Sequence, residues 1–126
     1  MIKMQCIPYD DAHFLDYIKP EWSIEDDPSE GFILLIDDEI AFGCAFVYLS
    51  LSIYEVYWTI NSDLLKKHQL SWKRLALYQL NRMKDCVILG RCARTKMGRA
   101  STLMALKLGF KIVLKGKYSQ TIRWSN

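Results

Sequence analysis

The chain has 126 residues, of which 51% are hydrophobic and 25% are charged, and its formal net charge at pH 7 is +3. This length fits one globular domain, and 13% aromatic residues exclude low-complexity disorder. The sequence contains neither an apolar run near the roughly 20 residues that span a bilayer nor the basic and apolar regions of a signal peptide. We therefore expect a single cytoplasmic domain over residues 1–126 with no membrane partner.

The charge is strongly polarised along the chain. Residues 1–40 carry eleven acidic and two basic residues, whereas residues 64–126 carry fifteen basic residues and one acidic residue. Two explanations stay open: the two parts neutralise each other in the fold, or the basic part binds a negatively charged ligand. An acidic protein partner and a phosphorylated cofactor are such ligands. Nucleic acid is disfavoured, because the basic residues are spread over several elements and no helix-turn-helix motif occurs.

The cysteines and histidines do not form a recognisable metal or disulfide pattern. No CxxC motif occurs, and even the two cysteines nearest to each other, Cys86 and Cys92, have five residues between them. We predict reduced, buried thiols and no bound metal. The residues concerned are Cys6, Cys44, Cys86, Cys92, His13 and His68.

The first part of the chain predicts a strand, a helix and an acidic loop. Residues 2–7 are apolar and extended in pattern, and residues 9–11 offer an N-cap for a helix over 12–22 with apolar residues at helical spacing. Pro20 should end or bend this helix, and residues 23–31 follow as a turn-rich loop or a short second helix.

Three consecutive antiparallel strands are predicted next. Residues 32–36 and 40–49 form a hairpin about the polar connection 37–39, and residues 53–60 form the following strand. Alternation in this last strand places two sets of side chains on opposite faces. One face carries Tyr54, Val56, Trp58 and Ile60, and the other carries Glu55, Tyr57 and Thr59.

The basic part of the chain predicts helices alternating with strands. Residues 63–70 form a helical turn or a loop, and Ser71 then caps an amphipathic helix whose apolar stripe contains Trp72, Leu75, Ala76, Leu80 and Met83.

A short buried strand over 86–92 precedes a second helix over 96–108, which Gly109 terminates. Two strands, 110–115 and 118–124, close the chain about a turn at Gly116. The apolar stripe of this second helix is expected to be Met97, Ala100, Met104 and Leu108.

This order of elements and two segments resemble the GNAT superfamily of acetyl-CoA-dependent N-acyltransferases over nearly the whole chain. Residues 98–111, GRASTLMALKLGFK, are similar to the family pattern N-x-x-A-x-x-L-Y-x-x-L-G-F-K. Residues 33–45, ILLIDDEIAFGCA, are similar to the family hairpin in which a glycine opens the third strand. The resemblance implies an α/β (α+β) fold, a single GNAT-like domain whose central, mixed but mostly antiparallel twisted sheet of six to seven strands is flanked by three to four helices.

The resemblance also implies a site for acetyl-CoA as co-substrate. The family's pyrophosphate-binding loop, R/Q-x-x-G-x-G/A, corresponds to residues 67–73, in which Leu70 and Trp72 replace the two glycines. The helix N-terminus and its lysines would still attract phosphate. Where the fourth and fifth strands of the family fold splay apart, backbone groups of the fourth strand pair with pantetheine. The implied binding residues are Thr59, Ile60, Gln69, Leu70, Ser71, Trp72 and Lys73.

The resemblance implies catalysis by a carboxylate of the fourth strand, because the amine must lose a proton when it attacks the thioester. Glu55 is the only carboxylate of that strand, and it is either this general base or an exposed residue paired with a neighbouring basic side chain. Ala105 stands where many members have the tyrosine that protonates the leaving thiolate. Tyr118 and Tyr57 are the alternative donors, unless both are simply aromatic residues half-buried on the sheet.

Two functions from different classes follow. The first is acetyl transfer from acetyl-CoA to an amine acceptor, which is a small molecule or a protein lysine or N-terminus. The second is a catalytically degenerate protein that binds a partner through the basic residues 64–126. Tyr57-Trp58, residues 61–63 and the glycine-free helix start resemble small GNAT-like proteins of tailed bacteriophages, which implies a virion or host-interaction role.

Two further expectations concern acceptor and assembly. The acidic stretch 21–30 either attracts a cationic acceptor or is a solvated loop. The β-rich ending 121–124 offers an edge strand to a second copy, which predicts a possible homodimer.

Overall fold

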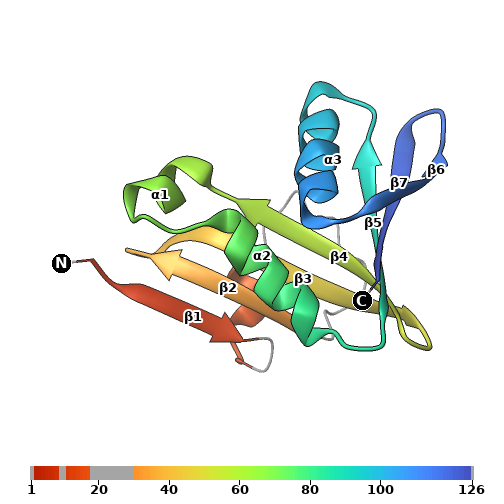
Figure 1. Cartoon of the computed structure of the whole chain (residues 1–126). Helices are drawn as coiled ribbons and strands as arrows, with labels where there is room; N and C mark the ends of the chain where they lie inside the picture. Colours follow the sequence, from red (N-terminus) through yellow and green to blue (C-terminus); the bar gives the residue numbers. More distant parts are fainter. Residues whose placement is uncertain (1, 9–10, 18–29, 126) are drawn as a thin grey trace.

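The computed structural model describes residues 2–8, 11–17 and 30–125. These residues form one twisted sheet with three α-helices on one face and a short 3-10 helix on the other (Figure 1). The strands are β1 Met4–Pro8, β2 Glu30–Ile36, β3 Glu39–Ser50, β4 Ile53–Ile60, β5 Val87–Ala93, β6 Lys111–Lys115 and β7 Ser119–Ser125. The helices are the 3-10 helix η1 Phe14–Tyr17 and the α-helices α1 Ser62–Lys67, α2 Trp72–Arg82 and α3 Lys96–Leu108.

The sheet has the strand order β1-β2-β3-β4-β5-β7-β6. Neighbouring strands are antiparallel except β4 and β5, which are parallel. This confirms the predicted mixed, mostly antiparallel sheet. One expectation is wrong: residues 121–124 do not form an edge strand, because β7 lies between β5 and β6 and both of its sides are hydrogen-bonded. The edge strand at this end of the sheet is β6.

The hairpin of β2 and β3 has a tighter turn than the sequence predicted. Ile36 pairs with Glu39, so the connection consists of Asp37 and Asp38 alone. Both residues have positive φ angles, of 49° and 66°, which is the pattern of a type I′ turn. This turn type follows the right-handed twist of the strands, and aspartate tolerates the left-handed conformation better than most residues.

Helices α1, α2 and α3 lie on one face of the sheet and enclose the main hydrophobic core (Figure 1). Ser71 caps α2 as predicted, and its side chain accepts a hydrogen bond from the Arg74 N–H. The predicted stripe of α2 is confirmed, since Ala76, Leu80 and Met83 are buried. The sequence predicts a helical turn or a loop over 63–70, and the structure has the short helix α1 at Ser62–Lys67, capped by Asn61.

Helix α3 buries a different stripe from the predicted one. Of the predicted stripe only Leu108 is buried, and Met97 is 81% exposed. A Cβ on Gly98 would overlap the carbonyl oxygen of Ala93 at the end of β5. This close backbone approach fixes the rotation of the helix about its axis. The buried residues are Gly98, Thr102, Ala105 and Leu108.

The opposite face of the sheet carries a smaller core of Ile7, Phe14, Ile33 and Leu35. Within the predicted helix over 12–22, the structure has the 3-10 helix η1 at Phe14–Tyr17. The rest of the predicted helix from residue 18 on, with Pro20, lies outside the described residues, and so does the predicted loop 23–31 up to residue 29. Phe14 lies directly over Gly31, where a Cβ would overlap the phenyl ring. This contact joins η1 to the start of β2.

Candidate active site between strands β4 and β5

Strands β4 and β5 separate after a short paired segment. They are in register at Ile53–Val87, Tyr54–Ile88 and Glu55–Leu89 and at no later pair, although β4 continues to Ile60 and β5 to Ala93. Figure 1 shows the two strands diverging from this point in a V, with α3 beside the arm formed by β5. The inner sides of both arms therefore carry backbone groups that the other strand does not pair.

The register of β3 and β4 identifies which backbone groups of β4 face the opening. Asn61 donates its N–H to the Ala41 carbonyl on β3, so alternation turns the backbone groups of Thr59 toward β3 as well. The backbone groups of Trp58 and Ile60 then point to the open side. Ile60 is thus well placed for the expected backbone pairing, and Trp58, which is not among the implied binding residues, lies beside it.

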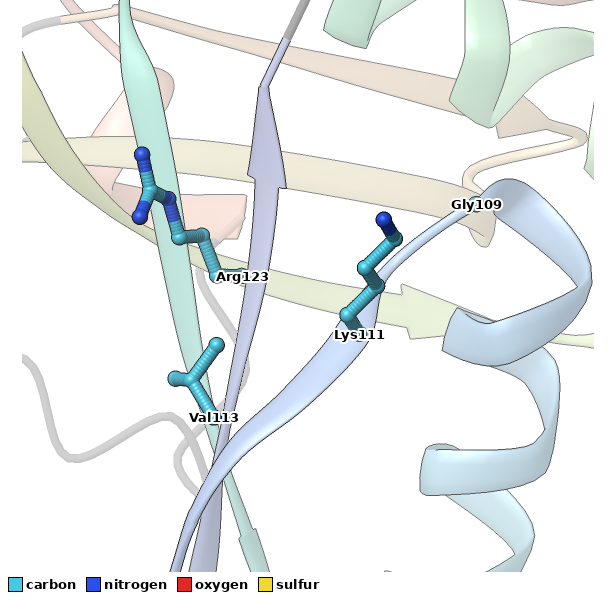
Figure 2. Close-up of a pocket in the computed structure, with 4 residues that line it drawn as sticks. All are labelled: Gly109, Lys111, Val113 and Arg123. Carbon is cyan, nitrogen blue, oxygen red and sulfur yellow. The ribbon is translucent and has the colours of Figure 1, made fainter.

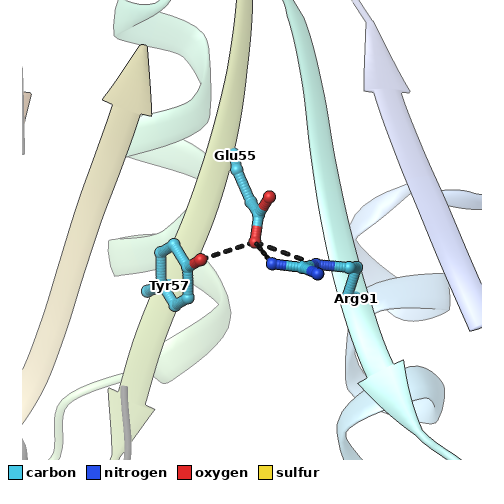
Figure 3. Close-up of polar contacts among 3 residues, drawn as sticks. All are labelled: Glu55, Tyr57 and Arg91. Atoms are coloured by element: carbon cyan, nitrogen blue, oxygen red, sulfur yellow. Dashed lines mark hydrogen bonds and ion pairs between the residues drawn. The ribbon is translucent and has the colours of Figure 1, made fainter. Parts of the chain in front are cut away.

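Glu55, Tyr57 and Arg91 meet at the apex of the V (Figure 3). The Tyr57 hydroxyl donates to Glu55 Oε1 at 2.6 Å, and Arg91 donates to the same oxygen from Nε at 3.2 Å and from Nη2 at 3.0 Å. The Glu55 side chain is 12% exposed and that of Arg91 is 66% exposed. No donor among the described residues is hydrogen-bonded to Glu55 Oε2.

The cluster shifts the titration of its members. The pKa of Tyr57 is raised above its ordinary value, with burial as the largest cause and the hydrogen bond to Glu55 as the second. The hydrogen bonds to Glu55 also raise the pKa of Arg91, which stays charged. Tyr57 is therefore a protonated hydrogen-bond donor at neutral pH. Glu55 pairs with a basic side chain, as the second interpretation expects, but it is buried and not exposed, and its role as the general base stays a prediction.

Tyr118 lies away from this cluster. It belongs to the turn between β6 and β7, its side chain is 77% exposed, and its carbonyl accepts a hydrogen bond from the Arg94 N–H. The register pairs Ser119 with Ala93, four residues beyond Leu89, which is the partner of Glu55. That offset corresponds to roughly 13 Å along the strand. The structure brings Tyr57, but not Tyr118, to Glu55.

The predicted phosphate-binding segment is the junction of α1 and α2. The N–H groups of Gln69 and Leu70 are bonded to carbonyls of α1, and Gln69 has a positive φ angle of 58°. The amides of Trp72 and Lys73, at the start of α2, have no carbonyl within the helix to bind. These two amides and the Lys73 side chain are therefore available to an anion.

The thiols and the other metal-ligating side chains form no site in the described part of the chain. Cys44 and Cys92 are buried as expected and Cys86 is partly buried, but Cys6 is exposed, because it lies on the outer strand β1. Burial raises the pKa of Cys44, so this thiol is unreactive. Nowhere in residues 2–8, 11–17 and 30–125 do three metal-ligating side chains gather, and none of their helices is long and apolar enough to cross a membrane.

Sequence reasoning missed Arg91 and a pocket at the edge of the sheet. Arg91 interrupts the apolar strand β5, and this break in the pattern was the available signal. The pocket has a volume of about 370 Å³ and, among the described residues, is lined by Gly109, Lys111, Val113 and Arg123 (Figure 2). Both basic side chains arise from opposed positions of β6 and β7.

No family model matches this sequence, and no curated protein matches it. Solved structures do match its fold. The N-acetyltransferase PseH of Campylobacter jejuni in complex with acetyl coenzyme A is similar with a TM-score of 0.61 and 12% identity, over 100% of this chain and 99% of PseH. A Bacillus subtilis acetyltransferase in complex with CoA is similar with a TM-score of 0.63 and 13% identity, over 100% and 99% of the two chains.

An IAA acetyltransferase of Bacillus cereus gives a TM-score of 0.63 and 10% identity over 100% of both chains. These likenesses span the complete chain, the splayed strands included. The resemblance to phage proteins and the virion role that it implies stay predictions. The shared architecture shows that the chain has the GNAT fold, the fold of these acetyltransferases.

Proposed function

We propose that this chain is a GNAT-type N-acetyltransferase, which transfers an acetyl group from acetyl-CoA to an amine. The observation that carries the proposal is the early separation of β4 and β5, because it opens backbone groups of β4 beside a buried carboxylate. Neighbouring structures of this fold were solved with acetyl coenzyme A and with CoA. The basic charge of residues 64–126 suits a ligand with several phosphates.

The residues at the opening fit acetyl-CoA in two places. The backbone groups of Trp58 and Ile60 offer an unpaired strand edge, which suits the two amides of a pantetheine arm and requires no particular side chain. The amides of Trp72 and Lys73 begin an 11-residue helix, which suits a pyrophosphate. The missing glycines limit how closely phosphate approaches this loop, so we expect weaker binding than in members that have them.

Acetyl-CoA supplies a thioester, and attack by an amine on its carbonyl carbon forms an amide, breaks the C–S bond and releases the CoA thiolate. The role of Glu55 is to accept the proton that the amine loses, at Oε2, directly or through one water. This proton ends on the thiolate, which restores the carboxylate of Glu55. Oε1 is held by Tyr57 and Arg91, which fix the orientation of the carboxylate. Tyr57, which stays protonated, donates a hydrogen bond to Glu55 and does not serve as a base.

The acyl acceptor is an amine of unidentified structure, and a protein lysine, a protein N-terminus and a small molecule all fit this chemistry. A panel of such amines with acetyl-CoA, read by mass spectrometry of the acetylated product, tests the activity. Mass detection is preferable to a thiol reagent because Cys6 is exposed.

The variant Glu55→Gln tests the role of the carboxylate. It removes the proton acceptor but keeps the shape and one hydrogen-bond acceptor, so we expect kcat to fall by about 100-fold or more, with little change in the KM for acetyl-CoA. Asp63→Asn, an exposed carboxylate of α1, is the matched control and should leave kcat unchanged. Absence of transfer to any amine would contradict the proposed function, and full activity of Glu55→Gln would contradict the role of Glu55.

A further inference from the structure

The cluster at the apex continues as a row of side chains across one face of the sheet. Glu55 is in register with Leu89, Leu89 with Arg123, and Arg123 with Lys111. Residues directly opposite each other on neighbouring strands point to the same face. Arg123 and Lys111 therefore lie on the same face as Glu55, away from the buried Ile122, which faces the helices.

This face is basic from β5 to the edge of the sheet. The sequence contains no aspartate or glutamate after Asp85, so β5, β6 and β7 contribute no carboxylate. Arg91 is paired with Glu55. Arg123 and Lys111 are both exposed, and among the described residues neither has an ion-pair or hydrogen-bond partner. Both positive side chains line the same pocket, so an anion bound in it would be attracted by both.

The two side chains form a shaped site. Lys111 and Val113 of β6, Arg123 of β7 and Gly109 line one pocket, and Figure 2 shows the Lys111 and Arg123 side chains on either side of the β7 ribbon. Val113 is the extra residue of a bulge in β6, between Ile112 and Leu114, and the bulge places its apolar side chain beside the two charges. A pocket lined by an ammonium, a guanidinium and one apolar side chain is suited to a carboxylate or a phosphate.

We propose that this pocket binds the anionic group of the acyl acceptor, so that the substrate class is an amine that also carries a carboxylate or a phosphate. This inference rests on the proposed function and specifies its acceptor. Two strand spacings separate Glu55 from Arg123, which is roughly 10 Å. An amine of this length would place its nitrogen near Glu55 while its anion binds Lys111 and Arg123.

Matched six-carbon amines test this inference. The probes are 6-aminohexanoate, 6-aminohexyl phosphate and the neutral 6-aminohexanamide, each titrated into the protein with acetyl-CoA present and each assayed as an acceptor. We expect at least one anionic probe to bind roughly 10-fold or more tightly than the amide, and the tighter of the two identifies the preferred anion. Equal affinity for the three probes would overturn the inference.

A pair of double variants separates local contact from overall charge. Lys111→Gln with Arg123→Gln should abolish the preference for anions. The control Lys107→Gln with Lys115→Gln removes the same charge from two exposed positions, one on α3 and one on β6. Lys115 pairs with Gln120, which points to the opposite face of the sheet from Arg123, so neither control residue lies at the pocket. It should keep the preference. A preference that survives the first pair, or is lost equally in both, would contradict the site.

The binding and transfer readouts distinguish the two proposals. Equal transfer to all three probes supports acetyl transfer and contradicts the anion site. Selective anion binding that needs Lys111 and Arg123, without any transfer, supports the anion site and contradicts the proposed function.

Discussion

Glu55 gains its importance from residues far away in the sequence. Arg91 is 36 positions along the chain, and it meets Glu55 because β4 and β5 are parallel and in register at this point. Sequence alone identified Glu55 as the one carboxylate of its strand, and alternation correctly placed Tyr57 on the same face. It could not identify Arg91 as the partner, because the register of a parallel pair is fixed by tertiary packing and not by a local turn.

Tyr57 provides a direct test of the cluster. Its raised pKa means that the protonated phenol is favoured in the folded protein, with burial as the first cause and the hydrogen bond to Glu55 as the second. An absorbance-monitored alkaline titration of the parent minus that of Tyr57→Phe should show a phenol that titrates above pH 10. A difference curve centred at or below the ordinary tyrosine value would contradict the hydrogen-bonded cluster.

The same shift predicts how stability depends on pH. Because the folded-state pKa of Tyr57 exceeds the unfolded value of about 10, its contribution to the free energy of unfolding is complete below pH 10 and is lost as pH rises through the folded pKa. Urea unfolding on both sides of this range should show a smaller loss of stability in Tyr57→Phe than in the parent.

At the scale of elements, α3 shows where periodicity fails. The sequence correctly predicted the start, the end and the Gly109 terminator of this helix, since local signals determine them. It placed the buried stripe on Met97 instead of Gly98, because glycine does not register as apolar in a hydrophobic pattern. The contact between Gly98 and the Ala93 carbonyl is a backbone approach, and no property of the side-chain pattern reveals it.

Gly98→Ala tests the packing of α3 on β5. The added methyl group would collide with backbone atoms of Ala93, which cannot move without disturbing the end of β5. We expect a loss of about 1–3 kcal/mol in the free energy of unfolding, despite the higher helix propensity of alanine. Arg99→Ala, at the neighbouring exposed position, is the control and should change stability by less than about 0.5 kcal/mol. A Gly98→Ala protein as stable as the parent would show that α3 lies farther from β5.

At the scale of the whole molecule, the charge polarity has a partial structural explanation. Glu30 and Arg82 form an ion pair of 3.6 Å between the acidic and the basic parts of the chain, in accordance with mutual neutralisation. Both side chains are 47% exposed, so this pair contributes little to stability. The exposed bases of β6 and β7 show no such pairing among the described residues, in agreement with ligand binding. The sequence shows the charge polarity, but it does not show which basic residues pair with acidic ones and which bind a ligand, because this depends on which strands become neighbours.

The measurement that tests the central claim most directly is isothermal titration of the protein with acetyl-CoA, beside CoA and ATP at matched salt. The opening between β4 and β5 offers a strand edge to pantetheine, which ATP lacks, so acetyl-CoA and CoA should bind roughly 10-fold or more tightly than ATP. Equal binding of ATP and acetyl-CoA, or binding of neither, would contradict an acetyl-CoA site at this opening.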